Sequence, residues 1–484
     1  MPSAIDLRPV GLSLADARHP LPLGARAACP HLSLPIPNAF SLRGILYSVF
    51  LLFALPPSLP ASTPAVPELS APVSEKLGAL RDLTDAKNYG AALALLEPLI
   101  AAAPQDSYDL AVLAQIKAQI ILNQGGPTAP AVAPLETALR LGDAHGFLNP
   151  DQTLEVLHLL AQLHYEQAAA AREPKVRQTE YAAAAAAVRR WLDQAPNPGE
   201  DALLLAALIY YNQAAAGPQP PEPAALRTVA ATAARGLTQT LQPKESLYLL
   251  LLATDQQLGQ TAAAADMLEL LVRRAPTNHD YWQQLAATYL ALAAAAPDDG
   301  EARRLNLRAL LTLERAQSHG ALRAPADNFN MAGLTFRLGQ PEHALGLLET
   351  GLRTGAITDD PALWDLLAMA GQQSHQEARA LADLAGASAP HPDDGRINYA
   401  RARLDYALDQ HAAARGELET ALARGHLDHP GQAALLLAYL DAEARQFDAA
   451  ARWLDEAARA PDTPTDDLAR LRDSLATNRP RNSP

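Results

Sequence analysis

Residues 328–352 read NFNMAGLTFRLGQPEHALGLLETGL, and this stretch decides the fold. Apolar and small residues recur every three or four positions on both sides of Gly339-Gln340-Pro341, which is the spacing of one buried face on each of two helices. Glycine and proline at the junction favour a turn. The stretch therefore predicts a helical hairpin. Two helices of this length cannot both hide their apolar faces from water, so we expect neighbouring hairpins along the chain.

The same pattern recurs downstream at a nearly constant spacing. Alanines equivalent to Ala344 follow at Ala380, Ala414 and Ala450, at intervals of 36, 34 and 36 residues. The unit that starts at Trp364 has an aromatic-x-x-Leu-Ala motif in its first helix and a proline near its end. A period near 34 residues with these features resembles the tetratricopeptide repeat (TPR).

This resemblance implies an all-α fold, a right-handed superhelical solenoid of about ten TPR-like helix-turn-helix hairpins. It extends over roughly residues 76 to 460, with irregular repeats at 76–241 and regular repeats at 242–461. Insertions lengthen several of the hairpins, for example AAAAPDDGEAR after Leu292. A solenoid has no fixed domain size, because each unit contacts only its neighbours, so we expect one long array.

The ends of the chain differ from the array. Residues 1–41 are rich in proline and show no helical or strand period, so we interpret them as a disordered extension or a mis-assigned translation start. Residues 62–75 are expected to form a Pro-rich linker. After the repeats, 462–484 should form a helix that caps the last hairpin, followed by a polar tail.

Residues 42–61 have the anatomy of a secretory signal. Arg43 precedes an apolar run of eleven residues, 45–55, and small residues near Ala61 and Ala65 suit cleavage. A membrane-spanning helix needs about 20 apolar residues, so the run favours export over anchoring. The expected location is therefore the periplasm or cell envelope. An uncleaved 45–55 segment that anchors the protein in the inner membrane is the alternative.

Composition and motifs argue against several classes of function. The formal net charge of −14 opposes binding to phosphate backbones, so we expect no nucleic-acid partner. The single cysteine, Cys29, precedes the apolar run, so an exported mature chain would have no disulfide and no cysteine-ligated metal. No phosphate-binding loop, nucleophile elbow or zinc-protease motif occurs. We predict that the protein is not an enzyme and binds no cofactor.

One histidine-containing segment has to be weighed as a metal site. His426, Asp428 and His429 lie together in RGHLDHP. Three residues in one turn make an incomplete ligand set, so a solvated loop between repeats is the preferred interpretation, and we expect no metal.

The remaining hypothesis is a non-catalytic scaffold that binds another protein. The resemblance implies a concave groove lined by the first helix of each hairpin, which holds an extended peptide or a helix. Helical spacing next to the buried stripe places seven side chains on that face: Phe329, Phe336, Arg396, Tyr399, Arg403, Tyr406 and Tyr439. Aromatic residues and arginine dominate binding hot spots, although the same aromatics would also suit packing against the next hairpin.

Three versions of this hypothesis stay open. The first is an exported scaffold that binds a segment of another envelope protein. The second is a membrane-anchored structural subunit of an envelope assembly or secretion complex. The third is an enzyme with a helical superstructure, which the sequence disfavours because no segment remains for a catalytic domain.

Overall fold

The computed structural model describes residues 67–322, 324–387 and 391–478. The predicted signal at 42–61, the extension at 1–41 and Cys29 lie outside these residues. The described chain falls into two compact units, and the boundary between them in the sequence lies within α10, between Met267 and Leu268. We call them the N-terminal unit (67–267) and the C-terminal unit (268–478).

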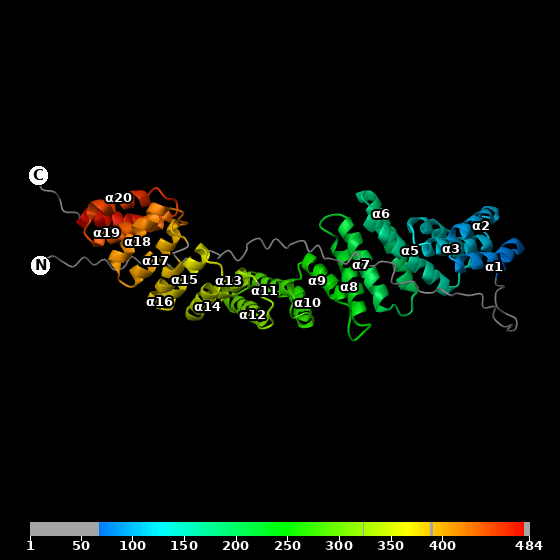
Figure 1. Cartoon of the computed structure of the whole chain (residues 1–484), viewed down its shortest axis with the longest axis horizontal. Helices are drawn as coiled ribbons and strands as arrows, with labels where there is room; N and C mark the ends of the chain where they lie inside the picture. Colours follow the sequence, from blue (N-terminus) through cyan, green and yellow to red (C-terminus); the bar gives the residue numbers. More distant parts are fainter. Residues whose placement is uncertain (1–66, 323, 388–390, 479–484) are drawn as a thin grey trace. The chain divides into compact units, whose positions relative to one another are not determined.

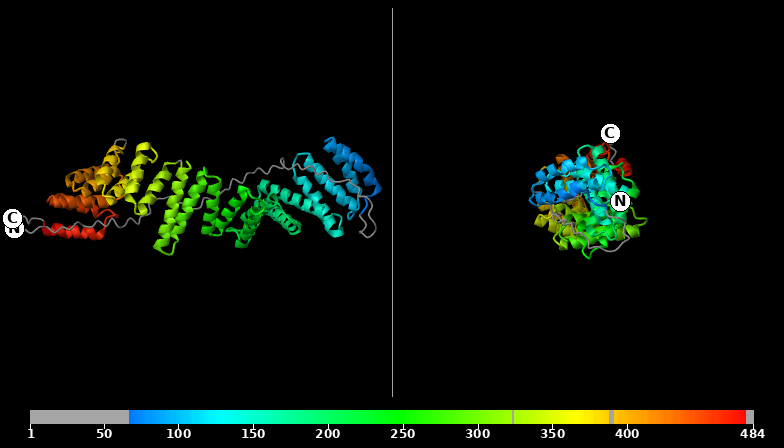
Figure 2. Two further views of the ribbon diagram at one scale, coloured as in Figure 1. Left: turned by 90° about the horizontal axis from the view of Figure 1, so that it is seen from below. Right: turned by 90° about the vertical axis from the view of Figure 1, so that its right-hand side faces the viewer.

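The described residues are helical and contain no strand, and the helices follow one another in pairs (Figures 1 and 2). The N-terminal unit holds α1 (Ala71–Asp85), α2 (Tyr89–Ala102), α3 (Tyr108–Asn123), the 3₁₀ turn η3 (Ala129–Ala131), α4 (Val132–His145), α5 (Pro150–Ala170), α6 (Pro174–Gln194), α7 (Glu200–Ala216), α8 (Pro223–Leu237), α9 (Glu245–Gln257) and the start of α10 (Thr261–Arg274).

The C-terminal unit continues from the end of α10. Its helices are α11 (His279–Ala294), α12 (Asp299–Ser318), α13 (Pro325–Arg337), α14 (Pro341–Thr354), α15 (Pro361–Gln373), α16 (Glu377–Ala387), α17 (Gly395–Ala407), α18 (His411–Arg424), α19 (Pro430–Glu443), α20 (Phe447–Ala457) and α21 (Thr465–Asn478). The succession of helix pairs confirms the predicted all-α, TPR-like solenoid of about ten hairpins.

Helix α1 begins at Ala71, inside the stretch 62–75 that the sequence suggests is linker. Pro72 lies in the first turn of this helix, where the backbone N–H that proline lacks would have no helical partner. The prolines of this segment therefore do not exclude a helix, and the linker is shorter than expected.

Six of the hairpins share one turn, which sets the register of their two helices. The middle residue of this turn is left-handed in each case, with φ between 54° and 79°: Lys87, Gly259, Gly339, His375, Asp409 and Arg445. The next residue donates its backbone N–H to the carbonyl five residues earlier, as Gln376 does to Gly371 at 2.8 Å. This is the 6→1 bond that ends a helix with a left-handed residue.

The turn leads directly to the marker alanines. Four residues after Gln340, Gln376, Gln410 or Gln446, the N–H of an alanine bonds back to the glutamine carbonyl. These alanines are fully buried: Ala344, Ala380, Ala414 and Ala450. The constant turn therefore places a fully buried side chain of one carbon atom in the first turn of each of these second helices.

First helices also pack on one another inside the C-terminal unit. Helix α15 packs against both α14 and α16, and α17 lies against α15 (Figure 1). Helix α21 packs on α19 and α20 and buries Leu471 and Leu475. Side chains from successive first helices can therefore meet on one surface.

Candidate partner-binding surface

The predicted binding residues lie on the first helices of the C-terminal unit. Three of them, Tyr399, Arg403 and Tyr406, lie on α17 at spacings of four and three. On the neighbouring first helix α15, Asp365 and Gln372 lie seven residues apart. Residues seven or four apart share one helix face, so packing of α15 on α17 brings the two sets together.

Arg403 joins the two helices. Its Nη1 lies 2.6 Å from Oδ1 of Asp365, and its Nη2 donates to Oε1 of Gln372 at 3.3 Å. Gln372 in turn donates from Nε2 to the Arg403 carbonyl at 3.1 Å. The guanidinium also lies 5.9 Å from the ring centroid of Tyr399, within cation–π range. We call Asp365, Gln372, Tyr399 and Arg403 the Arg403 cluster.

Exposure within the Arg403 cluster is uneven. The side chain of Arg403 is 12% exposed, whereas that of Asp365 is 54% exposed. Tyr399 is partly buried, and burial raises the pKa of its hydroxyl. The Asp365 carboxylate is therefore the most accessible charged group of the cluster, and the largely buried Arg403 orients it.

Tyr406 and Tyr439 form a second aromatic group where α17 meets α19. Their rings pack edge to face with centroids 6.3 Å apart, and the His411 ring stacks on Tyr406 at 5.5 Å. Tyr439 is only 7% exposed. Burial raises the pKa of its hydroxyl, and a hydrogen bond with Glu443 raises it further. The Glu443 carboxylate also lies 3.3 Å from Nδ1 of His411.

The two predicted phenylalanines lie in the core between α13 and α15. Phe336 is 7% exposed, and Phe329 is partly buried against the same hydrophobic cluster. Phe329, Phe336 and Tyr439 are therefore largely buried among neighbouring helices, which is the packing role that the sequence left open beside partner binding. A binding role for them stays a prediction.

Arg396 lies apart from the Arg403 cluster, in the first turn of α17. Its Nη2 is 2.7 Å from Oδ2 of Asp394, the residue that caps this helix, and this arginine lowers the pKa of Asp394. Arg396 lines a shallow pocket of about 400 Å³ together with His391, Pro392, Asp393, Asp394 and His426.

His426 lines the same pocket as Arg396. In the part of the chain that the structure describes, no group of three or more histidine, cysteine, aspartate or glutamate side chains is placed to hold a metal ion. No helix of the described residues is long and apolar enough to cross a membrane.

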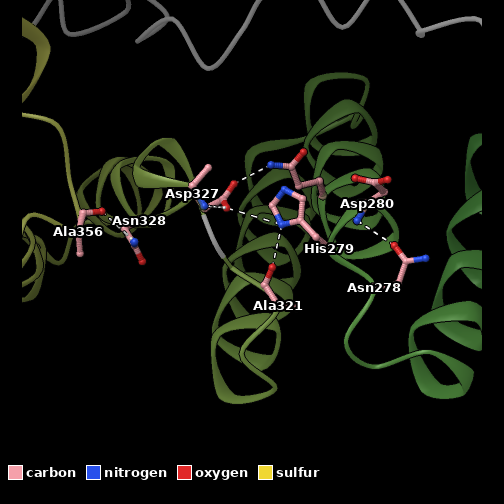
Figure 3. Close-up of polar contacts among 9 residues, drawn as sticks. Asn278, His279, Asp280, Ala321, Asp327, Asn328 and Ala356 are labelled. Carbon is pink, nitrogen blue, oxygen red and sulfur yellow. Dashed lines mark hydrogen bonds and ion pairs between the residues drawn. The ribbon is translucent and has the colours of Figure 1, made fainter.

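Sequence reasoning missed a buried carboxylate that ties α11 to α13 (Figure 3). Asp327 is 2% exposed and accepts hydrogen bonds from Nε2 of Gln283 at 2.6 Å and from the backbone N–H of Ala324 at 3.0 Å. His279 lies beside it, with Nδ1 2.8 Å from the Ala321 carbonyl and 3.7 Å from Oδ2 of Asp327. An acidic residue three positions after a helix start is the sequence feature that could have revealed this cap.

Comparisons with known proteins bear on the fold alone. The fold is TPR-like. No model of a protein family matches the chain, and no curated protein sequence matches it. Among solved structures, a tetratricopeptide repeat protein from Parabacteroides merdae is 13% identical, covering 69% of this chain and 98% of that one with a TM-score of 0.30.

Two further solved structures are similar over a shorter part of this chain. PilF of Pseudomonas aeruginosa is 16% identical over 47% of this chain and 96% of its own, with a TM-score of 0.33. PilW, a type IV pilus biogenesis factor, is 16% identical over 46% and 96%, also at 0.33. At these TM-scores the likeness says nothing of function, and the TPR-like fold rests on the helix pairs themselves.

Proposed function

We propose that the protein is a non-catalytic scaffold that binds a segment of another protein on the first helices of its C-terminal unit. The observation that carries this proposal is the Arg403 cluster, in which a half-exposed carboxylate is held by an arginine from the neighbouring hairpin. A rigid, oriented carboxylate beside aromatic rings loses little entropy when a partner binds, which is the property of a binding hot spot.

The chemistry of the surface indicates the kind of segment that would bind. Oδ1 of Asp365 accepts a hydrogen bond from Arg403. Its other oxygen, Oδ2, can accept hydrogen bonds from a partner's backbone N–H groups or from its lysine and arginine side chains. Partly buried Met369 lies one helical turn from Asp365 and offers an apolar contact beside it. We therefore favour an extended or helical segment with a basic residue next to an apolar one.

The proposal also places this scaffold in the cell envelope, on the basis of the signal-like residues 42–61. Sequencing the N-terminus of the protein from cells tests this part separately. A mature chain that begins near residue 62 supports export, and one that begins at Pro2 or Ser3 overturns it. If the 45–55 segment remains, resistance of the protein to a carbonate wash of membranes would identify the anchored form.

Capture from envelope extract, followed by a titration with the purified partner, tests the binding surface. Asp365→Lys reverses the exposed charge, and we expect the partner affinity to fall about tenfold or more, since opposite charges then become like charges. Reversal also puts a second positive charge beside Arg403, whose side chain is 12% exposed, so this variant should lower the melting temperature as well. Asp365→Asn keeps an oxygen that can accept from Arg403, so it should weaken partner binding with a smaller change in melting temperature.

Glu342→Lys is the matched control, because Glu342 is an exposed acid on the second helix α14. This control should retain full affinity. Equal losses in the two variants would indicate a general charge effect, and full binding by Asp365→Lys would place the partner elsewhere. Tyr439→Ala is unsuitable for this test, since removal of a side chain that is 7% exposed would also leave a cavity.

A further inference from the structure

Helix α12 exposes leucines on the side opposite to its buried face. Leu307 and Leu311 are 44% and 47% exposed, among the most exposed large hydrophobic residues of the described chain. The opposite side of α12 is buried at Ala309, Leu313 and Ala316. This side packs against α11 and α13 within the array. The two leucines therefore belong to a second stripe, which the described chain does not cover.

The two leucines lie at the centre of a stripe whose other members are small or polar. Positions 300, 304, 307, 311, 314 and 318 alternate steps of four and three residues, which is the heptad spacing of the facing positions. At about 100° per residue, these positions fall in one stripe along the helix. All six are exposed or partly exposed: Gly300, Arg304, Leu307, Leu311, Glu314 and Ser318. We call them the α12 seam.

The charges of the α12 seam have opposite signs at its two ends. Arg304 lies one turn before the leucines and its side chain is 76% exposed, whereas partly buried Glu314 lies one turn after them. When this helix is reversed against a copy of itself, Leu307 meets Leu311 of the other chain and Arg304 meets Glu314. A parallel pair would instead oppose Arg304 to Arg304 and Glu314 to Glu314.

We propose that a second copy of this chain docks antiparallel on α12, with Leu307 against Leu311 at the centre and an Arg304–Glu314 ion pair at each end. Two antiparallel copies of the α12 seam place opposite charges and leucines against each other, which favours a copy of the chain over other occupants. An anionic lipid surface would attract Arg304 but repel Glu314, and the net charge of −14 would oppose it as well. Two leucines per chain bury little area, so the dimer is weak and concentration-dependent.

Charge reversal and restoration test the antiparallel register in the full chain by sedimentation velocity over a range of concentrations. Arg304→Glu opposes two acidic residues at both ends, so the dissociation constant of the dimer should rise about tenfold or more. Arg304→Glu with Glu314→Arg restores opposite charges between chains and should recover the wild-type dissociation constant. The local pair of Arg304 with Glu301 in the same helix stays broken in the double variant, so recovery reports the contact between chains.

Arg459→Glu is a matched control for this reversal. The side chain of Arg459 is 75% exposed and pairs with Glu456 three residues earlier, as Arg304 does with Glu301. This control should leave the dimer unchanged, and circular dichroism should show that all variants remain helical. A monomer at every concentration, or no recovery in the double variant, would overturn the proposal and leave another protein or a membrane as the occupant of the seam.

Disulfide formation gives an independent test of orientation. In a Cys29→Ser background, a mixture of Leu307→Cys and Leu311→Cys chains should form mixed disulfides under mild oxidation faster than either variant alone. A disulfide requires close Cα atoms, and the antiparallel seam brings position 307 nearest to position 311 of the other chain. Faster homodimer formation by Leu307→Cys alone would refute the antiparallel arrangement.

Discussion

The close contact between Gly371 and Ala380 allows a quantitative test of the repeat packing. Gly371 lies near the end of α15, and a Cβ atom added there would lie 2.5 Å from the Cβ of Ala380 in α16 and 3.6 Å from Cδ2 of Leu404. A distance of 2.5 Å between two carbon atoms is well inside van der Waals contact, so one of the helices must shift. Gly371→Ala should therefore overpack this contact at a cost of about 1–3 kcal/mol.

A matched glycine separates packing from helix propensity. Gly416 lies inside α18 with open space around its Cβ position, so Gly416→Ala should stabilise its helix by up to about 1 kcal/mol. Gly371→Ala also gains helix propensity, but the cost of overpacking against Ala380 should be larger than this gain. Combining Gly371→Ala with Ala380→Gly exchanges the two methyl positions, so the double variant should lose about 1–3 kcal/mol less than the sum of the single variants.

Amide hydrogen exchange measured by mass spectrometry reports this energy locally. Exchange in peptides from α15 and α16 should be faster in Gly371→Ala by a factor of several to about one hundred, because local opening follows the lost free energy. Peptides from α11 and α12 should exchange as in the wild type. If Gly371→Ala slows amide exchange in α15 and α16, as Gly416→Ala should in α18, then α15 and α16 are farther apart at Gly371 and Ala380 than the structure indicates.

Three further predictions concern the cap, pH and turn strain. Gly431→Ala should release α21 and speed its exchange, because a Cβ there would lie 2.2 Å from Oγ1 of Thr463; unchanged exchange would show that the cap is docked differently. Burial raises the pKa of Asp383 to about 6, helped by a hydrogen bond that the protonated carboxyl donates to the Glu349 carboxylate. The protonated Asp383 therefore stabilises the fold at low pH, and this stabilisation is lost as the pH rises through about 6. Asp383→Asn should therefore reduce the fall in melting temperature over that pH range. An equally steep fall in the variant would contradict the raised pKa. His375→Gly should raise the melting temperature slightly, because φ is 54° at this residue and a left-handed conformation costs a non-glycine residue about 1 kcal/mol; a lower melting temperature would place the cost elsewhere.

The helix pairs and their register could be predicted from the sequence because both depend on neighbouring residues. The markers Ala344, Ala380, Ala414 and Ala450 were selected by spacing alone, and each is fully buried. Their burial follows from the short turn before them, whose hydrogen bonds span only five residues. A regular period repeats this local geometry, so a single-sequence analysis recovers the architecture.

The surface residues depend on contacts that local spacing does not determine. Positions beside the buried stripe can face either the next hairpin or solvent, and a small rotation of one helix decides between them. Tyr439 is buried because Tyr406 from the preceding hairpin packs on it, and Asp365 is held in place by Arg403, 38 residues later. The sequence by itself thus determined a TPR-like array of hairpins, since the turn and the stripe are local. Only the tertiary structure decided which side chains of those hairpins are exposed, because that depends on how α15, α17 and α19 pack against one another.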